Sequence, residues 1–197
     1  MSTLLARRGF LSAVLGMFVV PRFAAAKEFS GVVLPDKARP AGSDADVRLL
    51  GGGMFRFLFL RYYVCGLYAA EGLLDAAAIL ARDAPRRVQL VAMRRITSFE
   101  FFWGLDKGLA DNMGESDSKE LHAPLEQVRA TIRSIGAITP GTRVSIDYVP
   151  GTGTSIVVDE RSRGTAIAGK PVNDALMRVW IGKRPLDASL KQALLGG

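Results

Sequence analysis

The segment YVPGTGTS at residues 148–155 holds residue types that could bind a phosphate group. Glycine backbone and hydroxyl side chains hold phosphate oxygens when such a loop joins a strand to the first turn of a helix, usually with a lysine. Here the next residues, IVVDE at 156–160, favour a strand, and the segment has no lysine. The sequence therefore predicts a β-hairpin turn at 150–155, in which glycines supply positive φ angles.

Two arginines that could bind an anion lie in the apolar segment MFRFLFLRYYVCGLYAAE at residues 54–71. Its aromatic and β-branched residues favour a strand, but a strand of this length would span roughly 60 Å, so we expect it to bend or break near Gly66. Alternation assigns Arg56 and Arg61 to opposite faces, both otherwise apolar and therefore both expected to be covered. Each arginine either reaches water at the rim of a sheet or anchors an anion in a pocket, and the sequence leaves both readings open.

The composition gives little support for a metal site or for a disulfide. Cys65 is the only cysteine and His122 the only histidine. A single cysteine forms no intrachain disulfide, and one cysteine with one histidine does not make a structural zinc site. The chain also contains neither a GxSxG nor an HExxH motif. We therefore expect no metal and no cofactor.

The first 26 residues have the pattern of an export signal. Arg7 and Arg8 precede an apolar run at residues 9–20, and FAAA at 23–26 offers small residues for cleavage. The run of about a dozen residues is too short to span a bilayer of about 30 Å. RRGFL also fits the twin-arginine pattern, so both export routes stay open. We expect a periplasmic or otherwise exported protein whose mature domain is 27–197, with membrane contact only through the signal.

The charge balance of residues 27–197 argues against a nucleic-acid partner. This part of the chain carries 23 basic and 19 acidic side chains, a net charge of only +4. The paired arginines at 86–87 and 94–95 are isolated, and such pairs are most often found on a solvated face or at strand ends. Neither pair forms the concentrated basic patch that nucleic-acid binding requires.

The order of predicted elements indicates an α+β fold, with antiparallel strands and helices on one face of the sheet. A capping box of Thr97 and Glu100 opens a helix, Pro124 places the start of another near His122, and Asp187 opens the last helix. The other predicted elements are a helix at 73–83, strands at 86–93, 142–149, 155–160 and 163–167, and a helix at 171–182.

Three segments together resemble the bacterial chalcone isomerase-like proteins. They are GGGMFRFLFLRYYVCGLY at 51–68, DYVPGTGTSIVV at 147–158 and LMRVWIGKRPLDASLKQALLG at 176–196. The resemblance covers almost all of residues 28–196 in the same order. It implies an open-faced β-sandwich, in which a layer of helices backs an antiparallel sheet. The family includes plant isomerases that cyclise chalcones to flavanones, and relatives that bind fatty acids without known catalysis.

The resemblance can be checked at the positions where the plant isomerases carry polar catalytic groups. Their arginine, first threonine, tyrosine, asparagine and second threonine correspond to Phe55, Tyr63, Leu105, Asn112 and Val179. Only the asparagine matches, and Arg56 is displaced by one residue from the family's arginine. Phe55, Leu105 and Val179 cannot hold a phenolate or stabilise developing charge. The resemblance thus implies an apolar site and negligible chalcone cyclisation.

Three hypotheses for function remain open. The first, which we prefer, is an exported, non-catalytic protein that binds an apolar or fatty-acid-like ligand. The second is an isomerase or intramolecular lyase on an unknown substrate, with Arg56, Arg61, Tyr63 and Asn112 as its polar groups. The third is a structural or envelope-interaction domain without a ligand. The sequence leaves the oligomeric state open.

The candidate ligand-binding residues follow from the aligned positions and the two arginines. They are Phe55, Arg56, Arg61, Tyr63, Leu105, Asn112 and Val179. If the aligned strand positions mark the pocket face, alternation places Arg61 on that face too. Arg61 is therefore the expected anchor for a ligand carboxylate, ahead of Arg56.

We predict that export removes residues 1–26, because the apolar run is followed by small residues suited to cleavage. The intact mass of protein from the periplasmic fraction should then correspond to a chain that starts at Lys27. A chain that keeps Met1 and stays in the cytoplasm would contradict this prediction.

Overall fold

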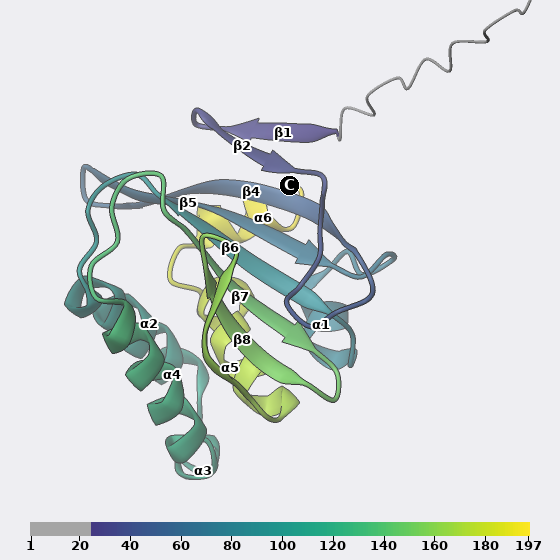
Figure 1. The fold of residues 1–197 in the computed structure, drawn as a ribbon, viewed down its shortest axis with the longest axis vertical. Coiled ribbons are helices and arrows are strands. Elements are labelled where there is room, and N and C mark those ends of the chain that lie inside the picture. The colour runs from purple at the N-terminus through teal and green to yellow at the C-terminus, as the bar shows by residue number, and fades with distance from the viewer. Residues whose placement is uncertain (1–24) are drawn as a thin grey trace, which may run out of the picture.

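A computed structural model describes residues 25–197 and shows an antiparallel sheet with helices packed against it (Figure 1). The seven strands of this sheet lie side by side in sequence order, so each pairs with the next along the chain. They are β3 (Lys37–Ala38), β4 (Val47–Phe57), β5 (Leu60–Ala69), β6 (Arg86–Ala92), β7 (Arg143–Val149), β8 (Gly153–Val158) and β9 (Arg161–Ile167). A separate hairpin is formed by β1 (Ala26–Phe29) and β2 (Val32–Pro35).

Six helices complete the described chain and confirm the predicted α+β class. They are α1 (Ala76–Ala81), α2 (Ser98–Asn112), α3 (Glu115–Glu120), α4 (His122–Ile135), α5 (Lys170–Ile181) and α6 (Ala188–Leu194). Helices α5 and α6 pack on the sheet, α2 packs across α5, and α4 lies beside α2 and against β9 (Figure 1). None of the helices in residues 25–197 is both long enough and apolar enough to cross a membrane.

Local capping signals in the sequence give the helix starts correctly. Thr97 and Glu100 form the predicted capping box at the start of α2, and Asp187 accepts a hydrogen bond from the backbone N–H of Leu190 at the start of α6. Helix α4 begins at His122 as expected. The predicted turn in PGTGTS is also confirmed, because it joins β7 to β8 as a hairpin. Gly151 and Gly153 both have positive φ there.

Both faces of the sheet are covered, as the two apolar faces of segment 54–71 predict. The larger hydrophobic cluster lies between the sheet and the helices, where Cys65 and Leu67 of β5 meet Leu176 and Trp180 of α5. The smaller cluster lies on the opposite face, under the β1–β2 hairpin. Among the described residues, the members of both clusters lie between Phe29 and Leu195.

The prediction that segment 54–71 bends or breaks is confirmed, but its predicted position near Gly66 is wrong. The chain reverses at Leu58 and Phe59, which form a two-residue turn between β4 and β5, and Gly66 lies within β5. The turn was missed because it contains none of the usual turn residues. Leu58 takes a positive φ of 54°, a conformation that usually selects glycine or asparagine.

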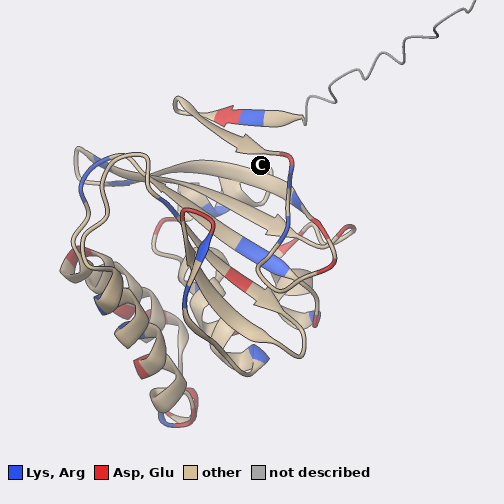
Figure 2. Cartoon of the chain, viewed as in Figure 1, with Lys and Arg blue, Asp and Glu red and all other residues tan. Residues whose placement is uncertain are grey.

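Arg86 and Arg87 lie at the start of β6, so of the two predicted positions the strand end is confirmed and the solvated face is wrong. Both are buried in β6, and each is neutralised by an acidic partner. Arg86 pairs with Asp174 and donates to the carbonyl oxygen of Ile79 at 2.6 Å. Arg87 donates through Nε and Nη2 to the two carboxylate oxygens of Asp147 on β7, at 2.6 and 2.8 Å. Figure 2 shows these opposite charges on neighbouring strands in the middle of the sheet.

We predict that Asp147→Ala lowers the free energy of unfolding by about 3–5 kcal/mol, because it leaves the Arg87 guanidinium buried without its counter-charge. The matched control is Asp46→Ala, which removes the exposed ion pair with Arg39 and should lower the free energy of unfolding far less. Urea unfolding measures both variants. Equal losses of unfolding free energy in the two variants would show that burial does not increase the contribution of the Arg87–Asp147 pair to stability.

Candidate functional site

An apolar cavity of about 140 Å³ lies where the hairpin end of β4 and β5 meets helices α2 and α5. Most of its wall is aromatic, and the aromatic side chains come from three parts of the fold. They are Phe55, Phe57, Tyr62 and Tyr63 from the hairpin, Phe99, Phe101 and Trp103 from α2, and Trp180 from α5. The exposed rings of Phe99 and Trp103 place the mouth of the cavity at the surface.

The close crossing of α2 and α5 positions the back wall of the cavity. Gly108 of α2 lies against Val179 of α5, and a Cβ at position 108 would overlap the Val179 side chain. Because glycine has no side chain, the two helices approach closely here. Leu105, one turn before Gly108, and Val179 therefore reach the same cavity.

Four of the seven candidate residues line this cavity: Phe55, Tyr63, Leu105 and Val179. The ring of Phe55 stacks on the ring of Tyr63, with centroids 4.9 Å apart. The apolar character expected at these aligned positions thus appears as a continuous apolar wall.

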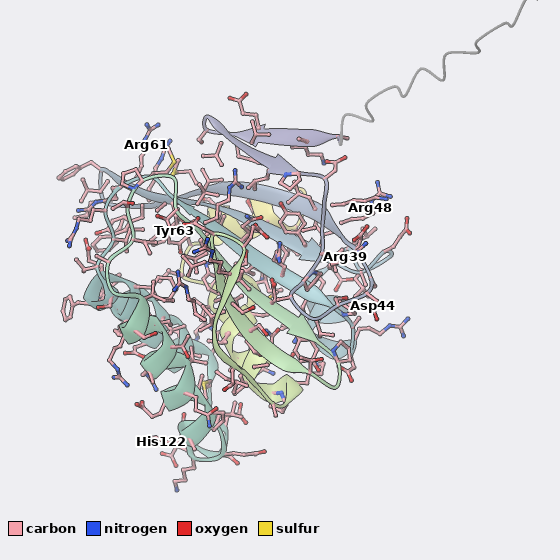
Figure 3. All side chains as sticks on the ribbon, viewed as in Figure 1. Arg39, Asp44, Arg48, Arg61, Tyr63 and His122 are labelled. Carbon is pink, nitrogen blue, oxygen red and sulfur yellow. The ribbon has the colours of Figure 1, made fainter. Side chains whose placement is uncertain are left out.

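The expectation that Arg61 shares a face with Tyr63 is wrong, because β5 contains a β-bulge. Phe55 pairs with Tyr63 and Arg56 pairs with Arg61, so Tyr62 is an extra residue on β5. Side chains paired across strands point the same way, so both arginines lie on the face opposite to Phe55. Both are exposed and neither lines the cavity. Figure 3 shows Arg61 at the outer edge of the molecule and Tyr63 within it.

Asn112 does not reach the cavity either. Its Nδ2 donates to the carbonyl oxygens of Gly108 and Arg184, at 2.9 and 2.6 Å, and its Oδ1 accepts from the Arg184 backbone N–H at 3.1 Å. These bonds tie the end of α2 to the loop between α5 and α6. The one residue that matches the plant pattern thus has a structural role in this fold.

The polar group inside the cavity is the hydroxyl of Tyr63. Its oxygen accepts a hydrogen bond from Nε1 of Trp180 at 3.2 Å. Burial raises the pKa of Tyr63 well above its usual value, so the phenol stays neutral and keeps its proton. No acceptor for that proton occurs among the hydrogen bonds of residues 25–197, which leaves the O–H free to donate.

A second set of polar groups gathers at the mouth. Glu100 Oε1 accepts from Arg94 at 3.1 Å and from the hydroxyl of Tyr62 at 3.5 Å. Its other oxygen accepts from the backbone N–H and hydroxyl of Thr97, at 2.8 and 2.9 Å. The guanidinium of Arg94 also lies 4.8 Å from the centroid of the Tyr62 ring. Of these groups, Tyr62 and Glu100 line the cavity, and they hold the Arg94 cation and the Thr97 hydroxyl just outside its wall.

The hydrogen bonds to Glu100 keep this group ionised. The backbone N–H of Thr97 contributes most to lowering the Glu100 pKa, with smaller contributions from the Thr97 hydroxyl, Arg94 and Tyr62, while partial burial acts in the opposite direction. Sequence reasoning found Glu100 as a helix cap but did not place it at a cavity. It also missed Arg94, and the available signal was the nearness of Arg94 to the predicted capping box.

Comparison with protein-family models gives one match that covers nearly all of the described chain. The model, described as chalcone isomerase-like, matches residues 26–196. The chain belongs to the chalcone isomerase-like family. This confirms the resemblance seen in the three sequence segments.

A solved structure supports the same fold for this chalcone isomerase-like chain. A fatty-acid binding protein of Arabidopsis thaliana aligns with a TM-score of 0.61 over 84% of this chain and 92% of that one. The two sequences are 19% identical, so the likeness establishes the shared fold. A comparison with curated proteins gave no match.

Proposed function

We propose that this protein binds a small amphipathic ligand of the fatty-acid type and carries out no reaction on it. The observation that carries the proposal is the division of the cavity into an aromatic interior and a mouth with polar and charged groups. The interior would hold the end of an acyl chain, and the carboxylate of the ligand would lie beside Arg94. The fatty-acid binding protein with the same fold supports this choice of ligand class.

The orientation of the ligand follows from the cost of burying charge. An ionised carboxylate loses its hydration if it enters an apolar interior, whereas at the mouth it keeps contact with water and a cation. Arg94 donates to Glu100 through Nη1, and an arginine carries further N–H donors that can bind a carboxylate. Tyr63 can donate to an oxygen atom that enters more deeply.

The volume of the cavity limits how much of the chain is enclosed. Its 140 Å³ is below the roughly 300 Å³ at which small-molecule pockets usually begin. An apolar cavity of about this size holds a benzene-sized molecule. A longer acyl chain must therefore extend past Phe99 and Trp103, or displace them.

The enzyme hypothesis loses its proposed polar set. Of Arg56, Arg61, Tyr63 and Asn112, only Tyr63 lines the cavity. An isomerase needs polar groups that converge on the reacting atoms. Tyr63 alone, held neutral by burial, is a hydrogen-bond donor and a poor acid or base near neutral pH.

The proposal also includes export, on the basis of the signal-like residues 1–26. Residues 1–24 of that segment lie outside the described residues, so export and cleavage stay predictions. Ala26 already pairs with Pro35 in the β1–β2 hairpin. Cleavage after Ala26 would therefore shorten β1 by one residue and leave the rest of the fold intact.

The first test fills the cavity from α2. Gly104 lines the cavity, and a Cβ at this position would meet only Leu186 at an ordinary contact distance of 3.6 Å. We predict that Gly104→Leu weakens dodecanoate binding at least tenfold, because its side chain occupies the ligand volume. Gly104→Ala is the control and should bind within about threefold of the wild type. Both should unfold at or above the wild-type temperature, since glycine within a helix costs about 1 kcal/mol.

Isothermal titration calorimetry with dodecanoate measures these affinities, and circular dichroism confirms folding. Failure of the wild type to bind dodecanoate would overturn the fatty-acid proposal. Wild-type affinity in a folded Gly104→Leu variant would place the ligand elsewhere.

A second prediction tests the carboxylate position. Arg94→Gln should weaken dodecanoate binding roughly tenfold, the value of a charge-assisted hydrogen bond of about 1.5 kcal/mol. Binding of the uncharged methyl ester should change little in the same variant. An equal loss for acid and ester would mean that Arg94 shapes the mouth and does not bind the carboxylate.

A further inference from the structure

Exposed apolar side chains concentrate at the same end of the molecule as the cavity mouth. Eight large apolar side chains are exposed among the described residues, and six lie at the hairpin end of β4 and β5 or in the first turns of α2. These six, which we call the apolar tip, are Phe57, Leu58, Phe59, Leu60, Phe99 and Trp103. The rings of Phe57 and Trp103 are in contact, with centroids 4.9 Å apart, so the two segments form one surface.

The turn itself presents the most exposed of these side chains. Leu58 is 78% exposed and Phe59 86% exposed, and together they form the outermost part of the hairpin. Leu58 holds a positive φ of 54° at a position where glycine would fit without strain. A leucine that is both strained and exposed lowers stability and solubility. Its presence at this turn therefore indicates that the side chain contacts another molecule.

The charged residues that flank the apolar tip are mostly basic. Segments 54–61 and 93–103 contain Arg56, Arg61, Arg94 and Arg95 and one acidic residue, Glu100, which pairs with Arg94. Arg56 and Arg61 are directly paired across the hairpin, an arrangement that like charges disfavour. Neither forms an ion pair within residues 25–197. Both guanidinium groups are exposed and therefore available to an external anion.

We propose that the apolar tip docks on a lipid bilayer whose surface carries anionic headgroups. Aromatic and aliphatic side chains would enter the interface while the arginines, on long flexible stems, bind phosphate groups around them. The tip is a narrow hairpin end, whereas a stable protein interface usually needs about 800 Å² from each partner. This surface is separate from the export signal. The sequence predicted membrane contact only through that signal.

Docking would bring the cavity mouth to the membrane. Phe57, Phe99 and Trp103 belong both to the apolar tip and to the cavity lining. An acyl chain could then pass between bilayer and cavity with little exposure to water. This transfer step rests on the proposed function, whereas docking follows from the surface alone.

The test is co-sedimentation of residues 26–197 with vesicles of phosphatidylcholine, with and without phosphatidylglycerol, in the absence of fatty acid. The wild type should bind the anionic vesicles and lose most binding in about 1 M salt, where screening acts within about 3 Å. Leu58→Gly with Phe59→Ser should reduce binding at least tenfold, because two apolar side chains leave the interface. This variant should fold at least as well, since glycine suits the turn.

Two matched controls separate the apolar tip from general surface properties. Leu74→Gln removes an exposed leucine at the opposite end of β5 and should leave binding unchanged. Arg56→Gln with Arg61→Gln should weaken binding to anionic vesicles roughly tenfold or more. Arg161→Gln with Arg163→Gln, which removes two exposed arginines of β9, should have a much smaller effect.

Several outcomes would overturn the proposal. They are the absence of wild-type binding to anionic vesicles, an equal loss in the Leu74 control, or an effect of β9 arginines as large as that of Arg56 and Arg61. A concentration-dependent dimer that the turn variant abolishes, with vesicle binding intact, would instead identify the apolar tip as a contact between two copies. The turn variant should retain its cavity and therefore still bind dodecanoate. Titration of this variant with dodecanoate thus tests the proposed function separately from membrane docking.

Discussion

The register between β4 and β5 is the constraint on which the rest of the site depends. A two-residue turn reverses the chain at Leu58, and the extra residue Tyr62 then shifts the pairing by one position. As a result, Tyr62 and Tyr63 both line the cavity with Phe55, while both arginines of the hairpin point away. Without the bulge, Arg61 would share a face with Tyr63 and place a charge toward the apolar interior.

The start of α2 links helix stability to the chemistry of the cavity mouth. The Glu100 carboxylate completes the capping box through one oxygen and holds Tyr62 and Arg94 through the other. A helix cap is stabilised by local bonds, so the carboxylate keeps its position without a ligand. The cation at the mouth is thereby held over the Tyr62 ring in advance of binding, which reduces the ordering cost of a charged ligand.

Stabilising and functional features separate along the sheet. At the end where β5 finishes and β6 begins, the buried arginines of β6 are neutralised by Asp174 and Asp147, and their bonds join β6 to α5 and β7. At the other end, the hairpin has exposed aromatic rings, a partly empty interior, and two arginines that form no ion pair with any described residue. The buried ion pairs stabilise one end of the sheet. This stability allows the opposite end to expose apolar side chains to water.

The sequence by itself determined the features that depend on neighbours within a few residues. The caps at Thr97 and Asp187, the hairpin in PGTGTS and the apolar character of both strand faces all follow from such local patterns. The three family-like segments also predicted the fold class, and four candidate residues, chosen because they align with the plant catalytic positions, line the cavity.

Only the tertiary structure decided the features that depend on residues far apart in the chain. The turn at Leu58 contains no turn-forming residue, and the bulge at Tyr62 is visible only in the pairing with β4. The burial of Arg87 depends on Asp147, sixty residues later, and the bonds of Asn112 depend on Arg184, seventy-two residues later. Spacing along the chain does not reveal such partners, because each contact forms only when separate elements pack together.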